Sequence, residues 1–383
     1  MRLAPRTARR HSGFAAPFVT CATGALLAAG AACAHAPAAP STEESFARAP
    51  AASSSVAPRV CARHAAPWGR DSNPGTKRQP YKTVQRLADR LRPGETGCLR
   101  GGRYDQISDG YVLDFDRGGR SGSRLVIRSY PGERATLVGT IQIPREAPYV
   151  TLAGLRILGT GDGNTLKIYS ANAVIKGNRI TNRGLGESCM ILGSTSDYGR
   201  AIRTVVRGNR FFRCGDADND NKDHAVYVSS SVGVRIVGNV FWQTAGYTIH
   251  FYPNARGSYV GRNVIDGGAP SVRGGVLFGG NDEYASSGNV VERNVIAYAR
   301  SSNITSGWDV QVGSGNIARR NCVWGARDRD IDVSDAGFVT RANVVARPRF
   351  VNRAGRDYRL RKGSRCRGVV GFSAVARVAA LGR

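Results

Sequence analysis

The strongest constraint on the fold of this chain is a short motif, built around an asparagine, that occurs seven times. Residues 174–180, 205–211 and 235–241 each place a Gly-Asn pair between two short runs rich in β-branched residues. Four later units share the asparagine between two such runs, with Arg or Ala in place of the glycine, and are centred on Asn263, Asn294, Asn321 and Asn343. Successive asparagines are 31, 30, 24, 31, 27 and 22 residues apart, a period that indicates stacked structural repeats.

Repeats of this length, with Gly and Asn turns and almost no helical periodicity, predict a β-solenoid in which each unit forms one coil. Leucine-rich repeats are the alternative, and the absence of their L-x-x-L-x-L pattern counts against them. Alternation within a unit predicts that Val205 points inward and Val206 outward. Each repeated asparagine then fits a tight inward bend, where its amide hydrogen-bonds neighbouring coils. We expect an all-β parallel solenoid of roughly nine to ten coils over residues 101–370.

One segment has helical periodicity. Val84, Leu87, Ala88 and Leu91 are spaced to share one face of a helix over residues 83–92, which Pro93-Gly94 would end. We expect this amphipathic helix to cap the open N-terminal end of the solenoid.

The two ends of the chain differ from the repeats in composition. Residues 1–36 start with a basic segment and continue as an apolar, Ala/Gly-rich stretch, which is typical of an export signal, although a disordered Ala-rich leader is the alternative. Residues 37–60 form an Ala/Pro/Ser-rich linker, residues 61–100 an N-terminal segment with the capping helix, and residues 371–383 a C-terminal tail. We expect a secreted protein, with lipid anchoring at Cys33 as the less favoured alternative.

The charge of the chain is strongly positive, with 55 Lys plus Arg against 28 Asp plus Glu, or +27. Such a field suits nucleic acid, an anionic surface or an acidic polysaccharide. The arginines are scattered instead of forming basic blocks, and no nucleic-acid-binding motif occurs. We therefore expect a monomer with an acidic polysaccharide as its partner, no nucleic acid and no transmembrane segment. A genome-wide arginine bias is the alternative explanation of the charge.

Six cysteines follow the leader, and none has the spacing of a zinc site. In an exported protein they are expected to pair, whereas free buried thiols are the alternative. We expect three disulfides that staple the two ends and the middle of the solenoid: Cys61–Cys98, Cys322–Cys366 and Cys189–Cys214.

Segments outside the repeats carry a resemblance to a known family. They are residues 69–76, 80–85, 93–94, 100–104 and 357–364. They resemble the start and the last coil of many secreted right-handed parallel β-helix proteins of the pectate-lyase-like superfamily. The resemblance covers about residues 61–370 and implies a right-handed solenoid. Because this fold hosts lyases, hydrolases, epimerases and non-catalytic surface proteins, function must be argued from side chains.

The densest run of chemically active side chains lies between residues 215 and 259. When the strand around Tyr227 is aligned with the strand around His250, alternation predicts that their aliphatic neighbours point inward. The side chains of Tyr227 and His250 are then expected to project outward on stacked coils. Tyr252 shares the outward parity of His250. His224 is expected to point inward or to lie in the preceding bend as a structural residue.

These residue types fit β-elimination on a uronate-containing glycan, in which a cation neutralises the carboxylate, a base takes the C5 proton and an acid protonates the leaving oxygen. We assign His250 as the base, Tyr227 or Tyr252 as the acid, and Lys222 as a catalytic cation. We expect these residues and Arg256 to converge on one outer groove. There, clustered cations would lower the pKa of an exposed His250.

A non-catalytic carbohydrate-binding or cell-surface solenoid is the alternative to this lyase-like function. In either case Arg256 and Trp242 are expected to bind the glycan, Arg256 through its charge and Trp242 by stacking on sugar rings.

An acidic loop offers a candidate calcium site at Asp216, Asp218 and Asp220. Their alternating oxygen ligands are typical of calcium loops, although the glycine and distal glutamate of an EF-hand are missing. Pectate lyases often use acidic clusters to bridge calcium to substrate carboxylates, so the resemblance favours a metal here. A solvated acidic loop is the alternative, and no other cofactor is expected.

Overall fold

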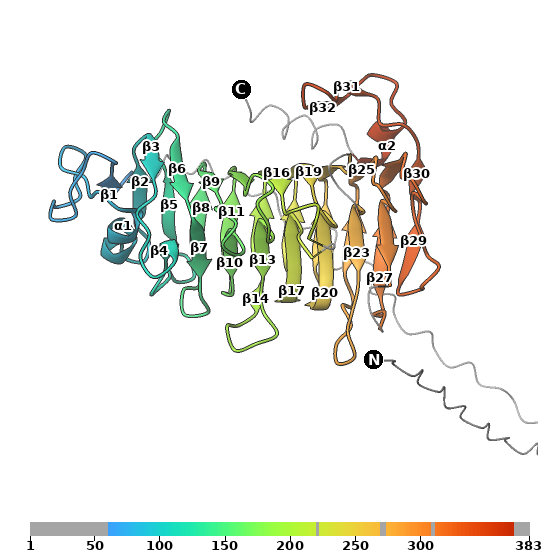
Figure 1. Ribbon diagram of the computed structural model, residues 1–383, viewed down its shortest axis with the longest axis horizontal. Coiled ribbons are helices and arrows are strands. Elements are labelled where there is room, and N and C mark those ends of the chain that lie inside the picture. The colour runs from blue at the N-terminus through green and yellow to red at the C-terminus, as the bar shows by residue number, and fades with distance from the viewer. Residues whose placement is uncertain (1–59, 220–221, 269–272, 308–310, 371–383) are drawn as a thin grey trace, which may run out of the picture. The chain divides into compact units, whose positions relative to one another are not determined.

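Each repeat folds into one turn of a right-handed parallel β-solenoid, because its β-branched runs form strands and the residues around its asparagine form a bend (Figure 1). The computed structural model describes residues 60–219, 222–268, 273–307 and 311–370. The predicted export signal, most of the linker, the anchoring position Cys33 and the C-terminal tail lie outside these residues. Within the described residues, no helix is long and apolar enough to cross a membrane.

Three parallel sheets, which we name A, B and C, run along the solenoid. Sheet A contains β1 (Arg63–Ala65), β2 (Thr96–Leu99), β5 (Leu125–Ser129), β8 (Val150–Ala153), β11 (Val174–Lys176), β15 (Val205–Arg207), β18 (Arg235–Val237), β21 (Tyr259–Gly261), β24 (Val290–Glu292), β27 (Asn316–Arg319) and β29 (Phe338–Arg341). Sheet B contains β3 (Gly102–Tyr104), β6 (Ala135–Val138), β9 (Arg156–Leu158), β12 (Arg179–Thr181), β16 (Arg210–Cys214), β19 (Val240–Thr244), β22 (Val264–Asp266), β25 (Val295–Ala297), β28 (Cys322–Trp324) and β30 (Val344–Val345). Sheet C contains β4 (Tyr111–Asp114), β7 (Thr140–Ile143), β10 (Leu166–Ile168), β13 (Met190–Leu192), β17 (Val226–Val232), β20 (Ile249–Arg256), β23 (Val276–Phe278) and β26 (Ile304–Ser306), with β14 (Ala201–Ile202) paired to β17.

About eight turns are complete, so the prediction of nine to ten coils is too high. The end turns explain the difference. At the N-terminal end, β1 belongs to a turn that has a strand in sheet A only. At the C-terminal end, the turns of β27–β28 and β29–β30 have strands in sheets A and B but none in sheet C within the described residues.

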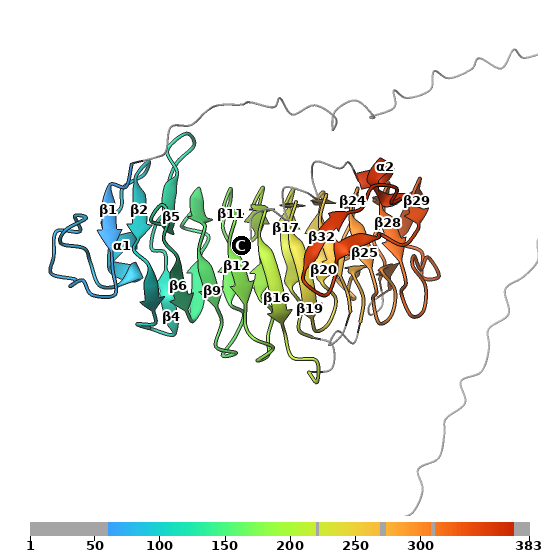
Figure 2. The ribbon, with the colours of Figure 1, turned by 90° about the horizontal axis from the view of Figure 1, so that it is seen from above.

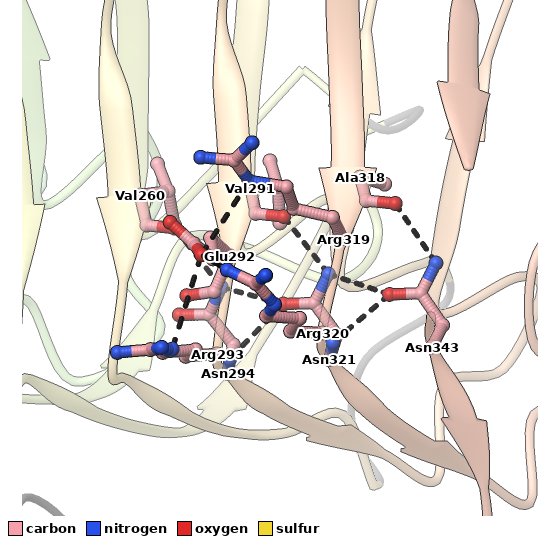
Figure 3. A network of polar contacts seen from close by, with 10 residues as sticks. All are labelled: Val260, Val291, Glu292, Arg293, Asn294, Ala318, Arg319, Arg320, Asn321 and Asn343. Atoms are coloured by element: carbon pink, nitrogen blue, oxygen red, sulfur yellow. Dashed lines mark hydrogen bonds and ion pairs between the residues drawn. The ribbon is translucent and has the colours of Figure 1, made fainter. Parts of the chain in front are cut away.

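The predicted asparagine ladder lies at the bend between sheets A and B. Asn209 shows the repeated pattern: its Nδ2 donates to Ile175 O at 2.8 Å and to Asn239 Oδ1 at 3.0 Å. The next amide does the same toward Asn263, and Figure 3 shows the pattern continuing through Asn294, Asn321 and Asn343. All members except the terminal Asn343 are almost fully buried. The ladder therefore satisfies polar groups inside the solenoid, as expected for a structural role.

The predicted orientation of Val205 and Val206 is wrong. Val206 lies in the core, and Val205 is partly exposed. Gly208, which precedes the inward Asn209, has a left-handed φ of 62°. This bend interrupts the alternation of side chains, so counting back from the asparagine by twos gives the wrong face.

All three predicted disulfides are present, at Cys61–Cys98, Cys189–Cys214 and Cys322–Cys366. The Cα atoms of Cys189 and Cys214 are 5.4 Å apart, so one coil does bring this pair to disulfide distance. Three disulfides fit a protein of an oxidising, extracellular environment.

The ends of the solenoid carry the remaining elements. Helix α1 (Val84–Arg90) buries Val84, Leu87 and Ala88 and contacts β1, β2 and β4. At the other end, the antiparallel strands β31 (Phe350–Asn352) and β32 (Asp357–Leu360) and the short helix α2 (Cys366–Val370) share an apolar cluster with the outer face of sheet B. Arg353 and Tyr358 also contact Asp266 of β22.

Candidate functional site

The outer face of sheet C brings Tyr227 and His250 together as direct register partners on β17 and β20. Their strand neighbours Val226 and Ile249 are fully buried in the solenoid core. The predicted alternation therefore holds here, and both the tyrosine and the histidine leave the strands on the outer side.

His250 contacts a second histidine. Its Nδ1 lies 2.8 Å from Nε2 of His224, and the two rings are nearly perpendicular, at 88°. His224 comes from the bend just before β17, where its backbone N–H donates to Ser188 Oγ and its carbonyl accepts from Cys189 N. In such a pair one imidazole donates its N–H and the other accepts it, so both rings are held in a fixed orientation.

Three tyrosines surround the histidine pair. Ring centroids of Tyr227, Tyr252 and Tyr247 lie 5.5, 5.3 and 5.7 Å from that of His250. Tyr227 and Tyr252 are partly exposed, whereas Tyr247 is buried. We refer to these three tyrosines with His224 and His250 as the His–Tyr cluster.

Burial controls the protonation of this cluster. His250 is only 3% exposed and His224 2%, so the prediction of an exposed His250 is wrong. Burial lowers the pKa of His224 to about 3, and burial followed by the nearby His224 lowers the pKa of His250 well below its ordinary value. The imidazole is neutral as expected, but desolvation is the cause rather than the predicted cations. Burial raises the pKa of the Tyr227 phenol, which stays protonated.

The other predicted site residues are not all at this place. Arg256 is the sixth residue after His250 on β20, so it lies roughly 20 Å further along the strand; its Nε donates to Asn254 Oδ1. Trp242 is on sheet B, 8% exposed and stacked on Phe212. Lys222 is exposed two residues before His224, within about 7 Å along the backbone. Among these predicted residues, Tyr227 and Tyr252 contact His250, and Lys222 is near the cluster along the chain.

The acidic loop is held together by its own hydrogen bonds. Asp216 accepts from the backbone of Asp218, and the buried Asp223 accepts from the backbone of Asp216 and from Asn219 Nδ2. Asp220 lies outside the described residues. No group of three His, Cys, Asp or Glu side chains that could hold a metal occurs in the described part of the chain.

Sequence reasoning missed His224 and Tyr247 as members of the cluster. Strand parity could not place His224, because it sits in a bend. A usable signal was present, since His224 lies three residues before Tyr227 and Tyr247 three residues before His250. Equivalent positions on two adjacent coils thus both carry aromatic rings.

The cluster combines the two components of acid–base chemistry. A neutral imidazole can accept a proton, and a protonated phenol beside it can donate one. Their environments push the two pKa values in opposite directions, which is the arrangement expected of separate base and acid groups.

Comparison with known proteins supports the fold. The chain is similar to a rhamnogalacturonan lyase (TM-score 0.58, 13% identity, covering 76% of this chain and 90% of that one). It is also similar to the pectate lyase Pel9A (TM-score 0.58, 14% identity, 80% and 91%) and to XylC in complex with xylose (TM-score 0.52, 10% identity, 73% and 67%). Identities this low establish the fold alone. The chain has a parallel β-helix fold, and the solved structures that share this fold include polysaccharide lyases.

The sequence comparisons are much narrower. No family model matches the chain. It is 29% identical over 76 residues to the uncharacterized protein YwoF of Bacillus subtilis (strain 168), covering 20% of this chain and 15% of that protein.

Proposed function

We propose that this protein is a polysaccharide lyase that cleaves a uronate-containing glycan by β-elimination at the His–Tyr cluster. The observation that carries the proposal is the register pairing of Tyr227 with His250, which places a protonated phenol beside a neutral imidazole on the outer face of sheet C. The lyases among the structural neighbours support the same class of reaction.

In the proposed reaction His250 Nε2, which is buried, takes the proton from C5 of the uronate after the glycan displaces the side chains that cover it. His250 Nδ1–H would donate to His224 Nε2, which fixes the tautomer that leaves Nε2 as the acceptor. The electrons of the C5–H bond form the C4–C5 double bond as the C4–O bond breaks. Tyr227 or Tyr252 protonates the departing oxygen, so proton and charge balance.

Positive charge is needed because the uronate carboxylate disfavours a developing negative charge at C5. Lys222, exposed just before His224, is the predicted cation that remains near the cluster. The structure adds Arg273, whose charge lowers the pKa of Tyr247 against the larger opposing effect of burial. We assign these two side chains to carboxylate neutralisation.

The test is the ultraviolet absorbance of an unsaturated uronate product, measured with pectate, alginate and glycosaminoglycans as substrates. We expect activity on at least one, and His250→Ala should lower its rate by about two to four orders of magnitude per folded molecule. His64→Ala is a matched control, because His64 is also buried but lies on β1 of sheet A. Inactivity on every acidic glycan, or full activity of His250→Ala, would refute the proposal. A chelator in the same assay tests the predicted calcium site.

Two structural assignments accompany this function. We propose that the protein is secreted through the export signal of residues 1–36, in agreement with its three disulfides. We also propose that α1 closes the N-terminal end of the solenoid, since its apolar residues are buried against β1, β2 and β4.

A further inference from the structure

Three arginines form a row on the outer face of sheet B, away from the His–Tyr cluster. Arg179 on β12 pairs in register with Arg156 on β9 and with Arg210 on β16. Figure 2 looks onto these strands and shows β9, β12 and β16 side by side. Parallel strands are about 4.8 Å apart, so the row offers one guanidinium per coil at that spacing. We call Arg156, Arg179 and Arg210 the arginine ladder.

This arrangement is unfavourable for the protein alone. Like charges directly opposite each other on a sheet repel. Burial, followed by the charges of Arg156 and Arg134, lowers the pKa of Arg179. Its Nε is buried with no hydrogen-bond partner among the described residues. The described part of the chain also contains no ion pair from an acidic side chain to Arg156 or Arg179.

Arginines elsewhere in the solenoid do have acidic partners. Asp266 on β22 accepts from Arg353, and Glu292 on β24 lies within ion-pair distance of Arg293, Arg319 and Arg320 (Figure 3). The protein thus neutralises clustered arginines internally in its C-terminal half. At the ladder this internal neutralisation is missing for Arg156 and Arg179.

An aromatic surface adjoins the ladder. Phe212, two residues after Arg210 on β16, has its ring centroid 5.9 Å from the Arg179 guanidinium and stacks on Trp242 at 5.0 Å. Beyond Trp242 the outer face of sheet B is covered by the segment that contains β31 and β32. The partly exposed Phe212 therefore offers a sugar ring a stacking surface at one end of the charged row.

We propose that the arginine ladder binds an acidic polysaccharide along the solenoid axis, at a non-catalytic surface distinct from the cluster on sheet C. An extended glycan with one anionic group per sugar presents spaced charges that successive coils can contact. Duplex DNA, by contrast, carries a charge about every 1.7 Å along its axis. The disulfides also favour an extracellular partner. The proposal does not depend on catalysis.

The experiment measures binding of polygalacturonate, alginate, neutral dextran and duplex DNA over a range of salt concentrations. The ladder variant carries Arg156→Gln, Arg179→Gln and Arg210→Gln. We expect it to lose about tenfold in affinity for the acidic glycan, as for three exposed ion pairs, with a shallower salt dependence. It should still fold, because the substitutions relieve repulsion, and the glycan should raise its thermal midpoint by less than it raises that of the wild-type protein.

A matched control removes the same charge from scattered exposed positions, through Arg120→Gln, Arg207→Gln and Arg341→Gln. We expect less than threefold loss for this control, roughly the effect of net charge alone. Equal losses in both triple variants, unchanged binding by the ladder variant, or DNA binding that depends on the ladder as strongly as glycan binding would each overturn the proposal. The binding readout requires no turnover, so a failed ladder test and an inactive wild type in the lyase assay are distinguishable outcomes.

Discussion

Two groups of buried polar side chains in the described part of this solenoid differ in one respect. At the bend between sheets A and B, the asparagines repeat on successive coils, and each amide bonds the next. On the outer face of sheet C, the His–Tyr cluster occurs once, on the two adjacent strands β17 and β20 and the bends before them.

The difference separates stability from chemistry. A polar group that recurs in every turn, with the same partners, serves the fold of every turn. A polar cluster that occurs once costs desolvation without serving the repeat, so a function is the better explanation. The following predictions test this contrast, from the largest expected effect to the smallest.

Removing the Cys189–Cys214 disulfide should affect both stability and activity, because this bond staples the solenoid and lies next to the His–Tyr cluster. Loop-closure entropy predicts a loss of about 3.5 kcal/mol in the free energy of unfolding for Cys189→Ala/Cys214→Ala. Because Cys189 N donates to the His224 carbonyl, activity per folded molecule should fall as well. Removing Cys61–Cys98 should cost similar stability and leave that activity unchanged. Urea unfolding and the elimination assay measure both quantities.

Breaking the asparagine ladder should lower stability and leave the activity per folded molecule unchanged. Asn239→Leu removes the acceptor for Asn209 N and Nδ2 and the donor to Val206 O. Leaving these buried groups unsatisfied should cost about 3 kcal/mol in urea unfolding. The partly exposed Asn343, where water can replace the lost bonds, gives the control Asn343→Leu with a loss below about 1 kcal/mol. Equal losses at both positions would contradict a cooperative buried ladder.

Replacing His224 should alter activity through His250. His224→Leu removes the acceptor for His250 Nδ1–H and should lower the rate about 10- to 100-fold, while His224→Gln, which keeps an acceptor, should restore part of it. The pH–rate profile of the Leu variant should also shift. Equal rates and unchanged profiles in both variants would show that His224 only fills space.

Acid should destabilise the protein through the same pair. Both histidines have folded-state pKa values below that of an unfolded histidine, near 6.5, so the unfolded chain binds more protons as the pH falls. Stability is therefore complete above about pH 6.5 and declines below it, by up to about 1.4 kcal/mol per pH unit for each histidine. Unfolding of the wild type and of a His224→Gln/His250→Gln variant between about pH 7 and pH 5 measures this slope. Identical slopes would contradict burial of a neutral pair.

Much of the fold could be predicted from sequence because each turn repeats the same physics. The asparagine spacing located the bends, and strand parity placed Tyr227 beside His250. Parity failed at Val205 and Val206, where the left-handed Gly208 interrupts the alternation. A second short ladder, Ser258–Asn289–Asn316, was missed because the repeat is less regular there.

The site was less predictable, because contacts between coils decide it. Sequence gives the face of a side chain but not what covers it, so the burial of His250 could not be anticipated. Trp242 and Arg256 were grouped with His250 by proximity in sequence. Trp242 is separated from His250 by the bend between sheets B and C. Arg256 is separated from His250 by most of the length of β20.

The most direct test of the account is an NMR titration of the imidazole nitrogens in the folded protein. We predict that His224 and His250 remain neutral as the pH falls well below about 6.5, with a proton shared between His250 Nδ1 and His224 Nε2. Protonation of both rings near their ordinary pKa would contradict a buried neutral pair, and with it the assignment of His250 as the base.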